Sequence, residues 1–286
     1  MKDNSMIALI KYNLIKCYKK NVIILTFLAI LIVCRVYMDS VSEYFVLSGK
    51  GINQWDYFFR IFSNGFLLTW LILPIMFLVT APIANFQESN KYLFVRCKSK
   101  FKIFIGNQIT NLLIITLYIT AIGACVFVLG IYYSNFGSEW SQAILNEKNV
   151  DVLSKYLYFA NFIKEYTPIK AMAISIFEFI IASYFLVLVR DVLLYIFKKS
   201  IIVTSICFIY IIINARSIVF LKLISTGYLG TIWCHKFTYS NNLSLNILDG
   251  MKLLTVGQEN IVAISIICLL FLIGIIAFRR CDVEKV

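Results

Sequence analysis

Few residues of this 286-residue chain are of the types that carry out chemistry. The single histidine, His235, has no cluster of cysteine, carboxylate or further histidine around it, as a metal site would require. The eight cysteines form no CxxC pair and lie mostly in or beside apolar runs, where cysteine behaves as a small hydrophobic side chain. We therefore predict no metal site and no catalytic residue.

Motifs that hold nucleotides or cleave bonds are also missing from the sequence. No GxxxxGK[ST] loop is present for nucleotide phosphates, and the SGKG turn at Ser48–Gly51 lacks that spacing. Neither a GxSxG nucleophile turn nor an HExxH zinc motif occurs. We predict that the chain is not an enzyme, binds no cofactor of its own, and draws any energy from a separate protein.

Three charged residues interrupt or end an apolar run in the second half of the chain. Glu178 lies inside the run, where a carboxylate costs about 2.5–3.5 kcal/mol on insertion scales. Two interpretations are open: it lines a path for a cationic substrate, or it hydrogen-bonds a Ser, Thr or Tyr of a neighbouring helix. Arg190 and Asp191 follow at the end of the run, where local ion pairing and coupling to a partner are the alternatives.

The densest positive charge lies in the stretch QESNKYLFVRCKSKFKIF, residues 87–104, which holds five Lys and Arg residues between two apolar runs. These cations either meet an acidic protein partner or act as a topology signal that binds anionic headgroups at about 1 kcal/mol each. The net charge of +12 is spread over such flanks and forms no basic domain, so nucleic acid is not a predicted partner.

The composition indicates what must surround these residues. The chain is 60% hydrophobic and only 15% charged, which is too little charge to cover a soluble core of this size. The lipid bilayer is therefore the predicted solvent, and a spanning helix needs about 20 apolar residues. We predict an all-α, polytopic membrane protein with a single transmembrane domain over residues 1–286. Its six predicted spans are residues 22–38, 66–84, 112–133, 169–190, 201–221 and 261–278.

Loop charges orient these spans, because Lys and Arg in short loops remain on the cytoplasmic side. Most of the 27 Lys and Arg residues fall in residues 1–20, 85–108, 190–200 and 279–286. Both termini are therefore predicted to be cytosolic, in a multi-pass protein of a bacterial cytoplasmic membrane.

Three further segments are neither plain spans nor plain loops. Residues 5–20 place apolar side chains at helical spacing among lysines, which predicts an amphipathic elbow helix on the inner leaflet. Residues 217–233 are apolar but interrupted by Lys222 and two glycines, which predicts an outer re-entrant segment between spans five and six. Residues 138–168 are predicted to form an outer loop with short helices.

The layout, together with one inner loop, resembles a known family. The loop 85–108, with acidic Glu88, basic Arg96 and the turn Ser99–Lys100, resembles the first cytoplasmic loop of type-2 ABC exporter permeases. The elbow, the six spans, the tight inner turn after span four and the re-entrant segment are similar to the same family.

The resemblance implies a role for the basic loop. In such permeases this loop carries a coupling helix that docks in a groove of a separate ATPase, with aromatic side chains in the groove and cations at its rim. The residues that this implies for ATPase coupling are Glu88, Lys91, Tyr92, Leu93, Phe94, Arg96 and Lys98, with Arg190 and Asp191 at the second inner turn.

The function implied is that of a permease subunit of an ATP-driven exporter. Its partners would be two copies of a cytosolic ABC ATPase, which hold ATP and Mg, and a second permease chain as a homodimer. The resemblance and the Ile, Lys, Asn and Phe bias of the chain favour export of amphipathic or antimicrobial peptides over export of polysaccharides or drugs. The alternative is a non-transporting membrane anchor or immunity protein that binds a peptide, and a membrane-embedded enzyme ranks third.

Overall fold

The computed structural model describes residues 4–17, 24, 26–36, 38–39, 51–62, 67, 71–84, 99–145, 166–209 and 256–280. Within these ranges the chain is all-helical and has no β-strand, apart from an isolated bridge between Asn53 and Asn135. The predicted all-α class is confirmed for this part of the chain.

Three helices are long and apolar enough to cross a membrane: α7 (Lys100–Tyr133), α11 (Pro168–Phe197) and residues Ala263–Arg280 of α16 (Val256–Arg280). This helical character is compatible with a membrane protein. Shorter apolar helices cover Thr26–Val36, Leu73–Ile83 and Ser200–Ile209.

The remaining named helices are short. They are α1 (Asn4–Cys17), α3 (Gln54–Phe62), α5 (Leu73–Ala84) and α8 (Gln142–Leu145).

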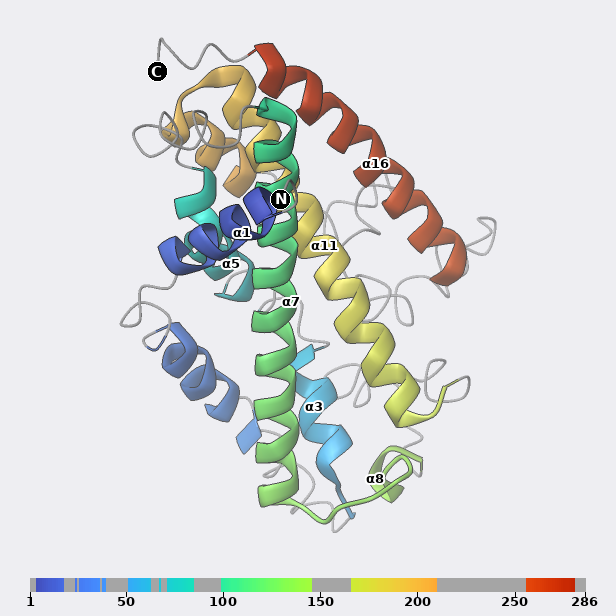
Figure 1. Ribbon diagram of the computed structural model, residues 1–286. Coiled ribbons are helices and arrows are strands. Elements are labelled where there is room, and N and C mark those ends of the chain that lie inside the picture. Colours follow the sequence, from blue (N-terminus) through green and yellow to red (C-terminus); the bar gives the residue numbers. More distant parts are fainter. Residues whose placement is uncertain are drawn as a thin grey trace.

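Helix α7 is the axis of the fold, and it contacts α1, α3, α5, α11 and α16 (Figure 1). At 1.5 Å per residue its 34 residues extend about 51 Å. Helix α1 crosses α7 near one end, whereas α3 lies beside the other end. Elements far apart in the sequence are therefore organised by their position along this one helix.

One end of the fold gathers the start of α7 and the closing turns of α11 and α16. The Lys100 side-chain amine donates a hydrogen bond to the Arg279 carbonyl at 3.1 Å. Below this contact the rings of Phe104, Tyr195 and Phe278 meet edge to face or tilted, with centroids 4.9–6.0 Å apart. The three helices are thus held together at this end by an aromatic cluster.

The opposite end joins α3, the end of α7 and the start of α11. Residues 134–141 leave α7 and turn back along α3, and the Trp140 indole N–H donates to the Tyr166 carbonyl at 2.9 Å. Arg35 stacks over the Tyr133 ring at 3.8 Å and pairs with Asp39 at 2.8 Å. Polar and aromatic side chains therefore surround this end as well.

The third predicted span is longer than its apolar run indicates. Leu112 was the expected first residue, but α7 begins at Lys100 and its polar first turns are part of the helix. Asn107, Gln108 and Asn111 are each less than 5% exposed, because α1 and α11 pack over them. Polarity indicated a loop here, whereas tertiary contacts bury the segment as helix.

The fourth predicted span also continues beyond its expected end at Arg190. Helix α11 runs on to Phe197 and stops at Lys198, whose left-handed backbone (φ 55) lets its N–H bond to the Leu194 carbonyl at 2.9 Å. The next helix begins at Ser200, so the turn between them is tight, as predicted.

The other predicted segments are described in part. The described helices Thr26–Val36, Leu73–Ala84 and Ser200–Ile209 fall in or at the edge of the spans predicted at 22–38, 66–84 and 201–221. Helix α16 covers the predicted span 261–278, and α1 covers most of the predicted elbow. Residues 85–98, 146–165 and 210–255, which include the predicted re-entrant segment, lie outside the described residues.

Gly274 allows α16 to approach the aromatic cluster. A Cβ atom at Gly274 would lie 2.8 Å from the Phe104 ring and 3.1 Å from a Val192 methyl group, so a larger residue must displace a buried ring. At Gly106 the nearest atom to an added Cβ is the tip of the Leu9 side chain, at 2.6 Å, and such a tip can rotate away.

We predict that Gly274→Ala destabilises the protein by about 1–3 kcal/mol, because overpacking must move the Phe104 ring. Gly106→Ala is the matched control and should cost clearly less. Thermal unfolding of both variants in detergent measures the difference. Equal melting temperatures of the two variants would contradict this, because they would mean that displacing the Phe104 ring costs no more than rotating the Leu9 side chain.

Candidate functional site

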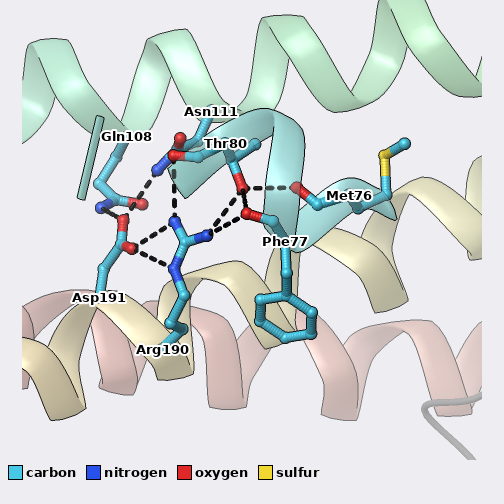
Figure 2. Close-up of polar contacts among 7 residues, drawn as sticks. All are labelled: Met76, Phe77, Thr80, Gln108, Asn111, Arg190 and Asp191. Carbon is cyan, nitrogen blue, oxygen red and sulfur yellow. Dashed lines mark hydrogen bonds and ion pairs between the residues drawn. The ribbon is translucent and has the colours of Figure 1, made fainter. Parts of the chain in front are cut away.

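The most polar buried site in the described residues is built around Arg190 and Asp191, consecutive residues of α11 (Figure 2). Arg190 is 4% exposed and Asp191 is 1% exposed. The Arg190 Nη2 and Nε atoms donate to Asp191 Oδ1 at 2.7 and 3.0 Å. The local pair expected from the sequence is therefore present, but it is buried.

The other donors of Arg190 reach across to α5. Nη1 donates to Thr80 Oγ1 at 2.9 Å and to the Phe77 carbonyl at 3.1 Å, and Nη2 donates to the Thr80 carbonyl at 3.5 Å. The Thr80 hydroxyl is itself oriented by donating to the Met76 carbonyl at 2.6 Å. All five N–H donors of the guanidinium group are thus used.

Asp191 reaches in the other direction, to α7. Its Oδ2 atom accepts hydrogen bonds from Gln108 Nε2 at 2.9 Å and from Asn111 Nδ2 at 2.8 Å. These two amides are three residues apart, so they project from the same face of α7. Through two adjacent residues, α11 is bonded to both α5 and α7.

The energetics of this site depend on its completeness. A buried ion pair contributes little net stability, because desolvation offsets the attraction, unless further hydrogen bonds satisfy both partners. Here a hydroxyl and two carbonyls complete the guanidinium, and two amides complete the carboxylate. Removing one member leaves the other as a buried unpaired charge, which costs about 3–5 kcal/mol. The three helices are therefore held in one arrangement.

Three buried polar atoms, two of them in this site, have no hydrogen-bond partner among the described residues. They are Gln108 Oε1, Asn111 Oδ1 and Ser183 Oγ. The amide nitrogens of Gln108 and Asn111 are directed to Asp191, so their oxygens are left over. A leftover buried acceptor costs about 1–3 kcal/mol.

The groups of the site interact with one another through ion pairing and hydrogen bonds. Its groups are a guanidinium, a carboxylate, amides and a hydroxyl, all engaged with one another (Figure 2). In the part of the chain that the structure describes, no group of His, Cys, Asp and Glu could hold a metal ion. What the site can do is keep three helices together or transmit a displacement from one to another.

A second polar cluster lies at the opposite end, where α3 begins. Asn53 Oδ1 accepts the Trp55 N–H at 3.0 Å, and Asp56 Oδ2 accepts the Asn53 N–H at 2.8 Å, which makes a reciprocal cap of the helix start. The cap is tied to the segment after α7, because Gly137 exchanges hydrogen bonds with Gln54 and accepts one from the Trp55 indole.

Asp56 is the buried titratable group of this second cluster. Its Oδ1 atom accepts a hydrogen bond from the Ser141 hydroxyl at 2.9 Å. Burial raises the pKa of the Asp56 carboxyl to about 7, and the hydrogen bonds from Asn53 and Ser141 lower it only in part. Asp56 therefore changes its charge near neutral pH.

The structure describes three of the site residues predicted from the sequence. Arg190 and Asp191 form the buried network, and Glu178 is half-buried in the first half of α11, twelve residues earlier. The remaining predicted coupling residues, which are Glu88, Lys91, Tyr92, Leu93, Phe94, Arg96 and Lys98, lie outside the described residues.

Sequence reasoning did not identify Thr80, Gln108 and Asn111 as site residues. The amides at 108 and 111 carry a signal, since two amides three residues apart at the start of an apolar helix share one face. Thr80 carries none, because a threonine within an apolar run is usual. Asp56 was also missed, although Asn53-x-x-Asp56 has the spacing of a helix cap.

No protein-family model, no curated protein and no solved structure matches this chain.

We predict that Arg190→Gln and Asp191→Asn each lower the free energy of unfolding by about 3–5 kcal/mol, because each leaves a buried charge unpaired. The double variant should lose less than the sum of the two, because neither charge remains. Denaturant unfolding in detergent measures all three. The control is Asp39→Asn, in a pair whose side chains are 40% and 49% exposed, which should cost less than about 1 kcal/mol. Additive single effects would contradict the coupling.

Asp56 predicts a dependence of stability on pH. The folded state binds the Asp56 proton more tightly than the unfolded state, because the pKa rises from 3.8 to about 7. Stability should therefore fall as pH increases from about 4 to about 7 and change little above that range. Asp56→Asn should remove this decline, so the variant gains over the wild type at pH 8 and not at pH 4. Melting curves at both values test this, and identical slopes in the two proteins would contradict it.

Proposed function

We propose that the chain is the membrane-spanning permease subunit of an ATP-driven exporter, with six spans and its ATPase on a separate protein. In this proposal α1 is the elbow helix on the inner leaflet, and residues 217–233 form the outer re-entrant segment. The loop 85–108 is the coupling loop. The chain lies in a bacterial cytoplasmic membrane with both termini in the cytosol, and it pairs with a second permease chain and two ATPase copies.

The distribution of charge between the two ends of the fold supports this orientation. The exposed cations Lys102, Lys198, Lys199, Arg279 and Arg280 belong to the end that holds the start of α7 and the ends of α11 and α16. The opposite end combines the cations Arg35 and Lys170 with the acidic Asp39 and Asp56. The described parts of residues 85–108, 190–200 and 279–286, which were expected on the cytoplasmic side from their charge, thus lie at one end of the fold.

The observation that carries the proposal is that the buried network joins the two helices between which the coupling loop lies in the sequence. Helix α5 ends at Ala84 and α7 begins at Lys100, so the loop connects the two helices that bind Arg190 and Asp191. A displacement of the loop therefore reaches α11 through the network. Because both residues are buried, we assign them to transmission between helices rather than to direct docking of the ATPase.

The proposed mechanism follows from this connection. Closure of the ATPases on ATP and Mg displaces the coupling loops. Helices α5, α7 and α11, which the Arg190–Asp191 network joins, then move as a unit and open a slit outward between the paired permeases. Glu178 on α11 is the proposed contact for a cationic or amphipathic peptide in the slit.

The test is purification of the tagged chain in mild detergent from the bacterium that carries it, with mass spectrometry of the proteins that accompany it. We expect a stoichiometric cytosolic ATPase, which is lost from the variant Tyr92→Ala, Phe94→Ala. The control is Tyr132→Ala, Phe136→Ala, which removes two aromatic side chains that are 79% and 69% exposed at the opposite end.

The outcomes separate the alternatives. An ATPase that persists in the Tyr92 and Phe94 variant would reject these residues as the docking site. A folded chain that brings no ATPase would reject the transporter and favour a membrane anchor or immunity protein.

A further inference from the structure

Five exposed cations surround one end of the fold, and we name them the basic rim. They come from three helices and are Lys102, Lys198, Lys199, Arg279 and Arg280. Lys102 lies in the first turn of α7, the two lysines follow α11, and the two arginines close α16.

The fold itself holds these cations near one another. The aromatic cluster of Phe104, Tyr195 and Phe278 packs the three helix ends together, with Tyr195 and Phe278 centroids 4.9 Å apart. The hydrogen bond from the Lys100 amine to the Arg279 carbonyl adds a direct connection between α7 and α16. The positive charges are therefore brought together by packing, despite their mutual repulsion.

No carboxylate of the described residues neutralises the rim. The acidic residue closest to it in these helices is Asp191, whose two oxygens are already bonded to Arg190, Gln108 and Asn111. Glu178 lies twelve residues before Arg190, toward the other end of α11. An external anion would therefore relieve the repulsion among the rim cations.

Apolar side chains beside the rim indicate what kind of anion this is. Phe101 is 41% exposed, Phe197 is 49% exposed and Ile276 is 55% exposed, each within a few residues of a rim cation. A soluble acidic ligand would satisfy the cations and leave these side chains in water. Cations next to exposed apolar side chains suit the boundary between lipid headgroups and acyl chains.

Helix α16 continues this pattern along its outer face. Leu269, Leu272 and Ile276 are 59%, 61% and 55% exposed and recur at helical spacing, so they form one stripe. Arg280 follows Leu269 by eleven residues, which is close to three full turns, and therefore lies above the stripe. Arg280 therefore lies at the end of an apolar stripe that extends over about three helical turns of α16.

We propose that the basic rim is a binding site for anionic phospholipids, with the lipid phosphate at Arg279 and Arg280 and an acyl chain along the α16 stripe. The site is independent of the proposed transport function, since it requires only a membrane that contains such lipids. Lys102, Lys198 and Lys199 supply further phosphate contacts around the same end.

The experiment uses the full-length chain, purified and stripped of lipid in detergent, and the probes are phosphatidylglycerol and phosphatidylcholine with the same acyl chains. Native mass spectrometry counts the lipids retained by the wild type and by two double variants. The glutamine variant carries Arg279→Gln with Arg280→Gln, and the lysine variant carries Arg279→Lys with Arg280→Lys. The charge-matched control is Arg35→Gln, Lys170→Gln, at the opposite end of the fold.

We expect the wild type to retain phosphatidylglycerol over phosphatidylcholine and the glutamine variant to bind phosphatidylglycerol roughly tenfold more weakly. The lysine variant and the control should keep the preference, and the lysine variant also covers the case in which the glutamine variant fails to fold. Glycerol 3-phosphate should not displace the lipid, because it lacks the acyl chains.

Equal retention of the two lipids by the wild type would overturn the proposal, as would an unchanged preference in the glutamine variant. Displacement by glycerol 3-phosphate would overturn the lipid assignment in favour of a soluble anion. If the wild type showed no lipid preference and instead co-purified with an acidic cytosolic protein that the glutamine variant did not bind, the ligand of the rim would be a protein, and the proposal would be overturned.

Discussion

The arrangement of the described helices depends on one requirement. Arg190 and Asp191 are buried among apolar helices, so every donor of the guanidinium and both oxygens of the carboxylate must find a hydrogen-bond partner. The pair alone accounts for two of the five guanidinium donors and for one carboxylate oxygen. The rest must come from other helices, so α5 supplies acceptors and α7 supplies donors. Because unpaired charges in an apolar interior are so costly, this requirement defines how three helices lie relative to one another.

The two ends of the fold meet the same physical demand in different ways. At one end, aromatic rings pack three helices under a rim of exposed cations. At the other, the side chains of Asn53 and Asp56 accept hydrogen bonds from free backbone N–H groups where α3 starts, and the Gly137 carbonyl accepts one from the Trp55 indole. Between them, apolar contacts predominate.

Much of the helical character was predictable, because long apolar runs in a chain with so little charge leave few alternatives to membrane helices. The local pairing of Arg190 with Asp191 was also predictable from adjacency. The partners of that pair were not, because Thr80, Gln108 and Asn111 are 80 to 110 residues away in sequence and are ordinary polar residues until the helices pack. For the same reason the start of α7 was misplaced: Asn107, Gln108 and Asn111 have the polarity of loop residues but are buried between helices.

The length of α7 constrains how it can sit in a bilayer. Its extent of about 51 Å exceeds a hydrocarbon core of about 30 Å. Tilt alone would have to reach about 54° to hide the whole helix, which is beyond the range of about 0–40° seen for membrane helices. Part of α7 must therefore stand outside the hydrocarbon as a stiff rod. Because α7 is bonded to α11 near its start, at Gln108 and Asn111, a small rotation of α7 about these contacts would displace its far end, near Tyr133, by a larger distance.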